Sequence, residues 1–311
     1  MSAISRADVV AAAERIRGRV HRTPTLTSAT AGEGVWLKAE LLQKTGSFKV
    51  RGVLNKLASL SPEEKARGVI GISAGNHAQA LAWGAAAEGI DALVVMWRGA
   101  SEAKIAATRG YGAAVDLDAA DPGEAFRRLD VLLEETGRTL VHPFDDPYTI
   151  AGQGTVGLEI LEDLPDVETI VVPIGGGGLI SGIAIAAADH GARVIGVEPE
   201  GSAAMHSALA AGERVEVTPS SIADGLNAPH AGRNALAIVQ KHVEKVVLVT
   251  EEEIATGFRF LYERAKLACE PAGAAAVAAV LAGKIDGGRV VCIVSGGNVA
   301  AQTAAGILAS R

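Results

Sequence analysis

The sequence predicts an α/β fold with a mainly parallel sheet, and two observations support this fold class. Apolar runs of strand length alternate with alanine-rich helical stretches along almost all of the 311 residues, as strands and helices do in parallel sheets. Three of the predicted strands are followed at once by a loop containing glycine and then by a helix. Because ligands of open parallel sheets bind at the carboxyl ends of the strands, these loops are where a ligand is expected.

The composition excludes several classes of protein. A chain of 311 residues with 49% hydrophobic and 21% charged residues fits one or two packed globular domains, which excludes disordered and fibrous proteins. The formal net charge is -7 and the chain has no basic run, so binding to nucleic acid or to an anionic membrane has no electrostatic support. A small molecule is therefore the expected partner.

The sequence also predicts a cytoplasmic location. Cys269 and Cys292 lie in apolar surroundings without a C-x-x-C spacing, which is typical of buried thiols in a reducing compartment. Closely spaced charges within residues 1–20 leave no apolar signal region and predict a surface helix. The uncharged run 170–188 contains Pro173 and four glycines, which would break a membrane-spanning helix.

The individual elements follow from the apolar patterns and from turn signals. The predicted strands are 35–38, 69–72, 92–97, 113–117, 140–142, 169–173, 193–197, 246–249 and 289–294. The predicted helices are 76–88, 101–109, 123–135, 152–162, 179–190, 252–266 and 274–281. The segment 68–145 holds compact strand-helix units and ends in a turn-rich joint, so it is predicted to form a small domain inserted into a large domain of residues 1–67 and 146–311.

The stretch 43–52 is where the chemistry is expected, because it places Lys49 in a small-residue turn that leads into a helix. The positive end of the helix dipole and the apolar Phe48 and Val50 disfavour the charged form of the lysine amine. Such an amine is a nucleophile and can form a Schiff base. The alternative is a surface lysine whose stem lies along apolar surface, followed by Arg51.

The first glycine-containing loop is Ser73-Ala74-Gly75-Asn76-His77. It follows the predicted strand 69–72 and precedes an alanine-rich helix, so its backbone amides point outward at a helix N-terminus. With side-chain donors from Ser73, Asn76 and His77, the loop is suited to binding a carboxylate or a phosphate. The alternative is purely structural, since Asn and Ser also cap helices without any ligand.

The second loop consists of the four glycines Gly175, Gly176, Gly177 and Gly178. Their lack of side chains lets a phosphate approach the amides, and the dipole of the following helix favours its charge. A dinucleotide-binding turn is the rival interpretation, supported by Glu198 at the end of the next predicted strand. The spacing argues against it, because Gly176, Gly178 and Gly182 are one residue more widely spaced than that fingerprint requires.

The third loop, Ser295-Gly296-Gly297-Asn298, follows the last predicted strand and precedes another helix. Ser295 alone could be a helix cap. One activatable lysine together with two or three anion-binding loops suits a phosphorylated aldehyde cofactor, pyridoxal phosphate (pyridoxal 5'-phosphate), better than a nucleotide.

These motifs, in this order and spacing, resemble the serine/threonine dehydratases (threonine ammonia-lyases) of pyridoxal-phosphate fold type II. The resemblance covers nearly the whole chain and includes His21-Arg22-Thr23-Pro24, Ala151-Gly152-Gln153-Gly154-Thr155 and Ala223-Asp224-Gly225. It implies a two-domain, open parallel-sheet fold similar to the tryptophan synthase β subunit, with the cofactor between the domains.

The resemblance also implies roles for individual residues. Lys49 would hold the cofactor and then act as the base at Cα, while Phe48 would lie against the cofactor ring. The four glycines would bind the phosphate, Asn76 would bind the ring hydroxyl and Ser295 would meet the pyridine nitrogen. Ser73, Asn76 and His77 would face the substrate carboxylate.

The activity implied is that of an ammonia-lyase converting L-threonine to 2-oxobutanoate and L-serine to pyruvate, in a homodimer or homotetramer. Serine racemase and dehydratases of 3-hydroxyaspartate or of the hydroxyectoine pathway are alternatives within the family. A NAD-dependent oxidoreductase and a non-catalytic amino-acid-binding protein are alternatives outside it.

Two departures from relatives narrow this expectation. Metal-dependent relatives carry a glutamate and an aspartate six residues apart, and here Glu198 is matched by Ala204, so no metal site is predicted. Racemising relatives carry Ser-Ser-Gly-Asn-His, whereas this chain has Ala74 at the second position. Since a methyl group cannot transfer a proton, elimination is expected rather than racemisation.

Overall fold

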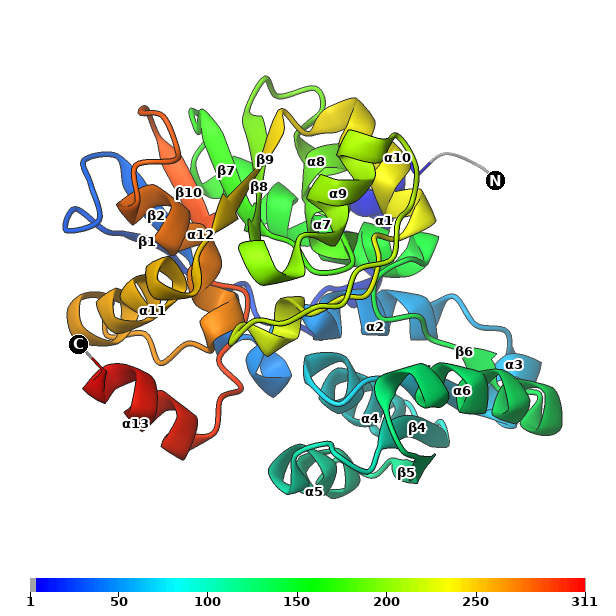
Figure 1. Cartoon of the computed structure of the whole chain (residues 1–311). Helices are drawn as coiled ribbons and strands as arrows, with labels where there is room; N and C mark the ends of the chain where they lie inside the picture. Colours follow the sequence, from blue (N-terminus) through cyan, green and yellow to red (C-terminus); the bar gives the residue numbers. More distant parts are fainter. Residues whose placement is uncertain (1–3, 311) are drawn as a thin grey trace.

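The computed structural model describes residues 4–310 and shows two sheets in two lobes (Figure 1). The six-stranded sheet has the order β1-β2-β10-β7-β8-β9, formed by Thr25–Thr27, Val35–Lys38, Val290–Ile293, Thr169–Pro173, Arg193–Pro199 and Lys245–Val249. The four-stranded sheet has the order β5-β4-β3-β6, formed by Ala114–Ala119, Ala92–Trp97, Val69–Ile72 and Thr139–Leu140. All pairings are parallel except that of β1 with β2, so the predicted α/β fold is confirmed.

The helices join and cover these sheets. They are α1 (Arg6–Ile16), α2 (Lys49–Ala58), α3 (Pro62–Arg67), α4 (Asn76–Ala87), α5 (Glu102–Gly110), α6 (Pro122–Thr136), α7 (Pro147–Asp163), α8 (Gly178–Ala187), α9 (Ala204–Ala211), α10 (Arg233–His242), α11 (Glu251–Phe260), α12 (Pro271–Leu281) and α13 (Ala301–Ala309). A π-helical turn, Leu261–Ala265, extends α11.

Every predicted strand and helix has a counterpart, but several bounds differ. The predicted helix 152–162 begins earlier, at Pro147, because Asp146 accepts a hydrogen bond from the amide of Thr149 and caps the helix. The predicted helix 252–266 instead becomes α11 and the π-helical turn, and ends where Lys266 takes a positive φ of 61°. The predicted strand 140–142 corresponds to β6, which has only the two residues Thr139–Leu140.

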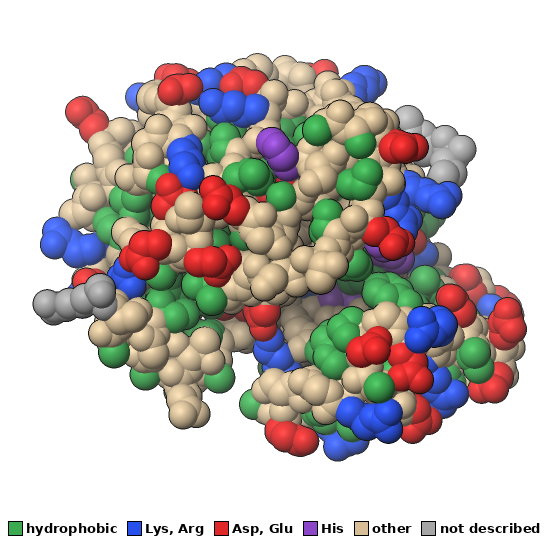
Figure 2. Space-filling view, in the orientation of Figure 1, with side chains coloured by type: hydrophobic (Ala, Val, Ile, Leu, Met, Phe, Trp, Pro, Cys, Tyr) green, Lys and Arg blue, Asp and Glu red, His purple; other side chains and the backbone are tan. Residues whose placement is uncertain are grey.

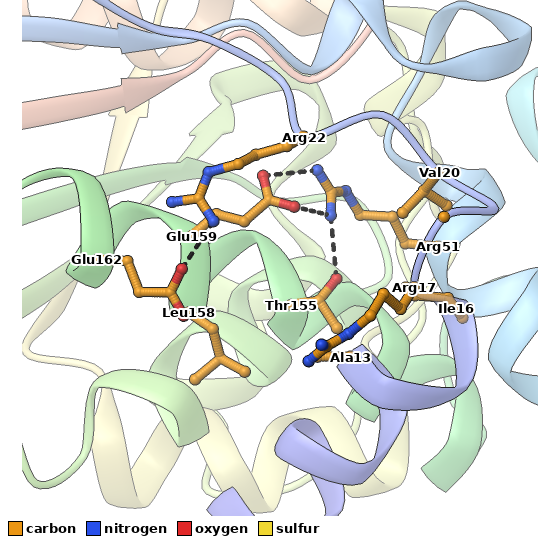
Figure 3. A pocket seen from close by; sticks show the side chains of 11 residues that line it. Ala13, Ile16, Arg17, Val20, Arg22, Arg51, Thr155, Leu158, Glu159 and Glu162 are labelled. Atoms are coloured by element: carbon orange, nitrogen blue, oxygen red, sulfur yellow. Dashed lines mark hydrogen bonds and ion pairs between the residues drawn. The ribbon is translucent and has the colours of Figure 1, made fainter.

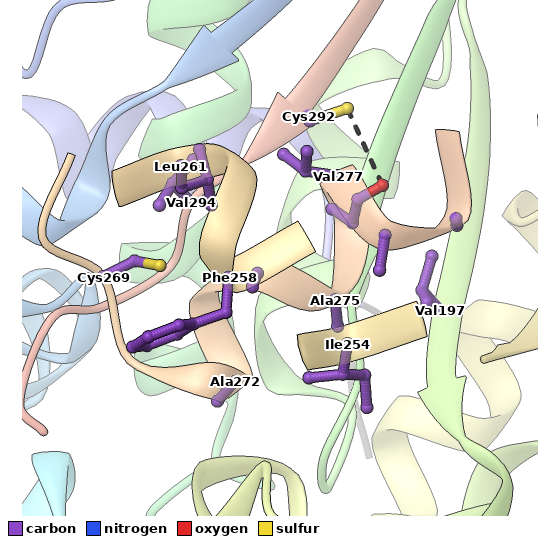
Figure 4. Close-up of a cluster of buried hydrophobic side chains, with 14 of the residues drawn as sticks. Val197, Ile254, Phe258, Leu261, Cys269, Ala272, Ala275, Val277, Cys292 and Val294 are labelled. Atoms are coloured by element: carbon purple, nitrogen blue, oxygen red, sulfur yellow. Dashed lines mark hydrogen bonds between the residues drawn. The ribbon is translucent and has the colours of Figure 1, made fainter. Parts of the chain in front are cut away.

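The large sheet is buried on both faces, as expected for parallel strands between helices. Along β10, Val290 and Cys292 pack on one face with α11 and α12, while Val291 and Ile293 pack on the other with α7, α8 and α10. The first of these clusters is shown in Figure 4, where the Cys292 thiol lies 3.8 Å from the carbonyl oxygen of Ala276. Both cysteines are buried and free, as the sequence predicts.

The small sheet lies within the segment predicted to be a separate domain, since its strands span residues 69–140. The domain bounds themselves stay a prediction. A space-filling view shows a hollow between the two lobes, with acidic and basic side chains interspersed over the visible face (Figure 2). Within residues 4–310, no helix has both the length and the apolar character needed to cross a lipid bilayer.

Candidate active site

Lys49 is the first residue of α2 and follows a segment that is fixed against the loop after β10. Ser47 forms a bridge with Gly296, and the amide of Phe48 donates to the carbonyl oxygen of Ser295 over 3.2 Å. The predicted lysine turn and the predicted Ser295 loop are therefore direct neighbours. Lys49 is half-buried as a residue, and its amine donates to the carbonyl oxygen of Pro143 over 2.8 Å and lies 5.2 Å from the centre of the Phe48 ring.

The surroundings of the amine lower its pKa. Burial lowers the pKa of Lys49 from 10.5 to about 8, against the opposing effect of the carboxylate of Glu270. No carboxylate within salt-bridge distance of Lys49 is found among residues 4–310. At pH 7 such an amine is neutral about 300-fold more often than an ordinary lysine, which makes it available as a nucleophile or base.

Arg51, two residues further along α2, lies in the opposite kind of environment. It is fully buried, and its guanidinium group donates to Glu40 and to Glu159 over distances of 2.7 to 3.0 Å. Figure 3 shows Arg51 with Glu159 and Thr155 beside a cavity of about 260 Å³. These ion pairs fix α2 to α7 and to the segment after β2, and so hold the start of the Lys49 helix in place.

The four-glycine loop joins β7 to α8 at the carboxyl end of the strand next to β10. The amides of Gly175, Gly176, Gly177 and Gly178 have no hydrogen-bond acceptor among the described residues. The helix cap is Gly177, which has no side chain to bind the first-turn amides of α8. A set of unpaired amides at a helix N-terminus is a binding site for an anion such as a phosphate group.

Three of these glycines also have a packing role, which the sequence does not reveal. A Cβ atom on Gly176 would overlap the ring of Phe144, and one on Gly178 would come within 2.6 Å of the Phe144 carbonyl oxygen. Gly177 has a positive φ of 97° and packs against Ala235 and Met205. The absence of side chains there serves the close approach of Phe144 as well as any ligand.

The Ser73 to His77 loop follows β3 in the small lobe. The hydroxyl of Ser73 accepts a hydrogen bond from the amide of Gly75 over 3.0 Å, and a Cβ atom on Gly75 would meet nothing within 4 Å, so this turn is open. His77 differs from its predicted role, because its imidazole is buried and its Nε2 lies 2.8 Å from the carbonyl oxygen of Val141. The ring nitrogen that would donate to a ligand is thus used within the protein, while the backbone amide of His77 lies in the first turn of α4, where amides lack partners within the helix.

Asn76 reaches across from the small lobe to two residues of the large lobe. Its Nδ2 donates to the carboxylate of Glu270 over 2.6 Å, and its Oδ1 accepts from Nδ2 of Asn298 over 2.7 Å. Burial raises the pKa of Glu270 to about 7, while the hydrogen bond from Asn76 opposes this shift. The first and third predicted loops thus meet in one hydrogen-bonded network.

Sequence analysis missed Glu270 and Phe144. Glu270 directly precedes Pro271, and this pair looks like an ordinary start of α12. The side chain of Glu270 makes no cap hydrogen bond, however, and is instead bound to Asn76. Phe144 lies in the joint interpreted only as a turn, and no signal in the sequence connects it to the glycine loop.

Glu198 has a structural role in this chain. Both of its carboxylate oxygens accept hydrogen bonds of 2.8 Å, from the amides of Met205 and His206 in the first turn of α9. A ribose contact of the kind required by the dinucleotide interpretation would have to compete with these two bonds. Among the described residues, no group of three His, Cys, Asp or Glu side chains is arranged to hold a metal ion.

The residues present fit a phosphorylated aldehyde. The chain provides an amine with a lowered pKa, an aromatic ring beside it, four unpaired amides at a helix N-terminus and an amide side chain that reaches across from the small lobe. Together with two open, mainly parallel sheets, they define a lysine-dependent cofactor enzyme of the α/β class.

Comparisons with known proteins agree with this class. The chain belongs to the family described as "Pyridoxal-phosphate dependent enzyme", whose pattern matches residues 16–296. Pyridoxal phosphate is therefore its cofactor, and the interpretation as a NAD-dependent oxidoreductase is set aside.

The chain is similar to ammonia-lyases and to a racemase. An L-threonine ammonia-lyase of Thermotoga maritima is 48% identical over 303 residues, covering 94% of this chain and 75% of that protein. The structure of maize serine racemase superposes with a TM-score of 0.92 at 37% identity, covering 97% of this chain and 96% of that one. The processed form of threonine deaminase isoform 2 from Solanum lycopersicum superposes with a TM-score of 0.90 at 33% identity, covering 97% and 86%.

Proposed function

We propose that this protein is an ammonia-lyase that converts L-threonine to 2-oxobutanoate and L-serine to pyruvate, with release of ammonia. The observation that carries the proposal is the Lys49 amine beside Phe48, whose pKa burial lowers to about 8, so that about a tenth of it is neutral at pH 7. The similarity to the threonine ammonia-lyase and threonine deaminase supports the substrate class.

The chain supplies the groups that this reaction needs. Bound pyridoxal phosphate supplies an aldehyde and an electron-withdrawing ring that stabilises negative charge at Cα of an amino acid. The amides of the glycine loop would bind the phosphate, and Phe48 would limit the movement of the ring. Lys49 would first hold the cofactor and, when the substrate amine takes its place, remove the proton from Cα.

The overall reaction is a loss of water followed by hydrolysis, so it needs no oxidant. Removal of the Cα proton is followed by loss of the β-hydroxyl group as water, and a water molecule then returns to release ammonia from the resulting enamine. The neutral hydroxyl of Ser295 would face the pyridine nitrogen, where it cannot keep that nitrogen protonated as a carboxylate would. We infer that this weakens charge storage on the ring and favours prompt loss of the β-hydroxyl group.

Racemisation of serine is the second candidate, because of the similarity to maize serine racemase. Ala74 argues against it, since racemising relatives have a serine at this position and a methyl group cannot return a proton to Cα. Dehydration of another β-hydroxy amino acid, such as 3-hydroxyaspartate, is the other alternative within the family, and the substrate panel described next tests it. A cytoplasmic location and a homodimeric or homotetrameric state also stay predictions.

One assay tests these alternatives together. The holoenzyme is incubated with a panel of β-hydroxy amino acids, and 2-oxo acid, ammonia and the enantiomers of unreacted substrate are measured. We expect most oxo acid from L-threonine and L-serine and little D-serine. A yellow, cofactor-loaded protein that releases no oxo acid from any of them would contradict the proposal.

Variants at position 74 sharpen the distinction from a racemase. Ala74→Ser adds a hydroxyl group and is expected to raise D-serine formation relative to pyruvate, whereas Ala74→Gly changes size without adding a proton donor and serves as its control. Chiral chromatography measures both. If the parent enzyme already makes D-serine as fast as pyruvate, another acid returns the proton and the assignment as a lyase alone is wrong.

A further inference from the structure

The hydrogen bonds around Asn76 form a relay with an acceptor at each end. At one end the carbonyl oxygen of Thr45 accepts from Nδ2 of Asn298 over 2.7 Å, and the same Nδ2 donates to Oδ1 of Asn76 over 2.7 Å. At the other end Nδ2 of Asn76 donates to Oε1 of Glu270 over 2.6 Å. A carbonyl oxygen and an ionised carboxylate can only accept, so both amide groups are held in a single orientation.

This orientation decides what Asn76 can offer to a ligand. With its Oδ1 bound to Asn298 and one N–H bound to Glu270, the second N–H of Nδ2 has no acceptor among the described residues. A flipped amide would point its Oδ1 at the Glu270 carboxylate and its Nδ2 at a donor, so both bonds would become repulsive. Ionised Glu270 thus forces Asn76 to present a donor.

The carboxylate of Glu270 is fixed in the position from which it orients Asn76. Glu270 is buried, its backbone amide donates to the carbonyl oxygen of Gly296 over 3.0 Å, and a Cβ atom on Gly296 would overlap its Oε1. It therefore lies directly against the Ser295 to Asn298 loop, in which Ser295 is the residue expected to meet the cofactor ring.

We propose that Glu270 is a positioning residue, which holds the Asn76 amide so that its free N–H binds the ring oxygen of pyridoxal phosphate. This inference rests on the cofactor and its expected place, and not on which amino acid is the substrate. Measurements of cofactor binding therefore test it separately from the proposed ammonia-lyase activity.

The charge on Glu270 depends on pH in the neutral range. Burial raises the pKa of Glu270 to about 7, and the charged or titratable groups that act on it are Lys49 of α2, Lys104 of α5, Asp224 and Cys269. Lys49 and Lys104 lower this pKa, and Asp224 raises it. Below pH 7 the carboxyl group gains a proton and can also donate, so the forced orientation of Asn76 is relaxed.

Exchanging the amide and the carboxylate between positions 76 and 270 tests whether Glu270 orients Asn76 for the cofactor or only stabilises the fold. Asn76→Asp alone brings a second carboxylate against Glu270 and should weaken both folding and cofactor binding. The double variant Asn76→Asp with Glu270→Gln restores a hydrogen bond of reversed direction, from the new amide at position 270 to the new carboxylate at position 76, but leaves no donor for the cofactor. We expect its Tm to recover while its Kd for pyridoxal phosphate stays at least about tenfold weaker than that of the parent.

Recovery of both Tm and cofactor affinity to within about twofold of the parent would overturn the proposal, because the network would then be only structural. If the double variant does not fold, the single variant Glu270→Gln decides. Parent affinity for the cofactor should show an additional weakening as the pH falls through about 7, and this component should be absent in Glu270→Gln, which keeps only the dependence that both proteins owe to Lys49. Equal pH profiles in the two proteins would also overturn the proposal.

Glu198→Gln is the matched control for these measurements. Glu198 is also buried and burial raises its pKa to about 7 as well, but its partners are the amides of α9. This variant should lower Tm and leave the pH dependence of cofactor affinity as in the parent. Loss of that dependence in Glu198→Gln would assign it to Glu198 and overturn the role of Glu270.

Discussion

The first turn of α2 carries two basic side chains, Lys49 and Arg51, whose surroundings shift their pKa values in opposite directions. Around Arg51, the carboxylates of Glu40 and Glu159 outweigh the cost of burial and raise the pKa of the guanidinium group. Around Lys49, burial dominates and lowers the pKa of the amine to about 8. The two side chains are two residues apart on one helix, so the presence or absence of a carboxylate in contact decides which cation is structural and which is reactive.

The largest expected effect comes from removing the reactive cation. Lys49→Ala deletes the amine that we propose both to hold the cofactor and to act as the base at Cα, so oxo-acid formation should fall at least about a thousandfold. The fold should remain, because the side chain of the half-buried Lys49 makes a single hydrogen bond with the described residues. Turnover within tenfold of the parent would show that Lys49 is not the catalytic residue.

Removing Arg51, the structural cation, should instead lower the stability of the fold. Arg51→Met leaves Glu40 fully buried without a cationic partner and should lower the free energy of unfolding by about 3–5 kcal/mol. Lys49→Met is the matched control and should change that free energy by less than about 1 kcal/mol, because no ion pair is lost. Chemical denaturation of both cofactor-free variants provides the comparison, and equal losses would remove the distinction between the two regions.

The pH dependence of cofactor uptake reports on the amine directly. Only the neutral amine attacks an aldehyde, so the rate of uptake by the cofactor-free protein should rise with pH up to about 8 and then level off. An ordinary lysine would give a rate that rises to about pH 10.4. Stopped-flow absorbance provides the rates, and a midpoint near that of free lysine would mean that burial does not activate Lys49.

The smallest expected effect comes from the carboxylate of Glu270, which acts on Lys49 without contacting it. The charge on Glu270 raises the pKa of Lys49, although burial outweighs it. Glu270→Gln removes this charge, so the midpoint of the uptake rate should move to lower pH. The same stopped-flow series measures the shift, and a midpoint that moves upward would contradict the sign of this interaction.

The fold was accessible from the sequence because strands and helices of a parallel sheet carry strong local patterns. Apolar runs such as 169–173 and alanine-rich stretches such as 76–88 needed no knowledge of distant contacts. The antiparallel edge strand β1 was missed because Thr25–Thr27 has only three residues and only one apolar side chain. Helices α9 and α10 were also missed, since α9 has only eight residues and follows β8 after a single 3-10 turn, while α10 follows the largely irregular segment 212–232.

The site was accessible only where its residues occur in compact motifs. Lys49 and the four glycines stand in local sequence contexts that already indicate their chemistry. Glu270 is 194 residues from Asn76 along the chain, and only the folded structure brings the two into contact. The imidazole of His77 looked like a free donor, but the packing of β6 against β3 places the carbonyl oxygen of Val141 beside it.

The most direct test of the central claim is to locate the cofactor on the chain. The purified holoenzyme should be yellow, and reduction with borohydride should fix the cofactor permanently to the amine that holds it. Peptide mass spectrometry is then expected to find the reduced cofactor on Lys49, with the other lysines unmodified. Labelling of a different lysine, or a colourless protein that gains no such mass, would contradict the assignment of Lys49 as the reactive amine.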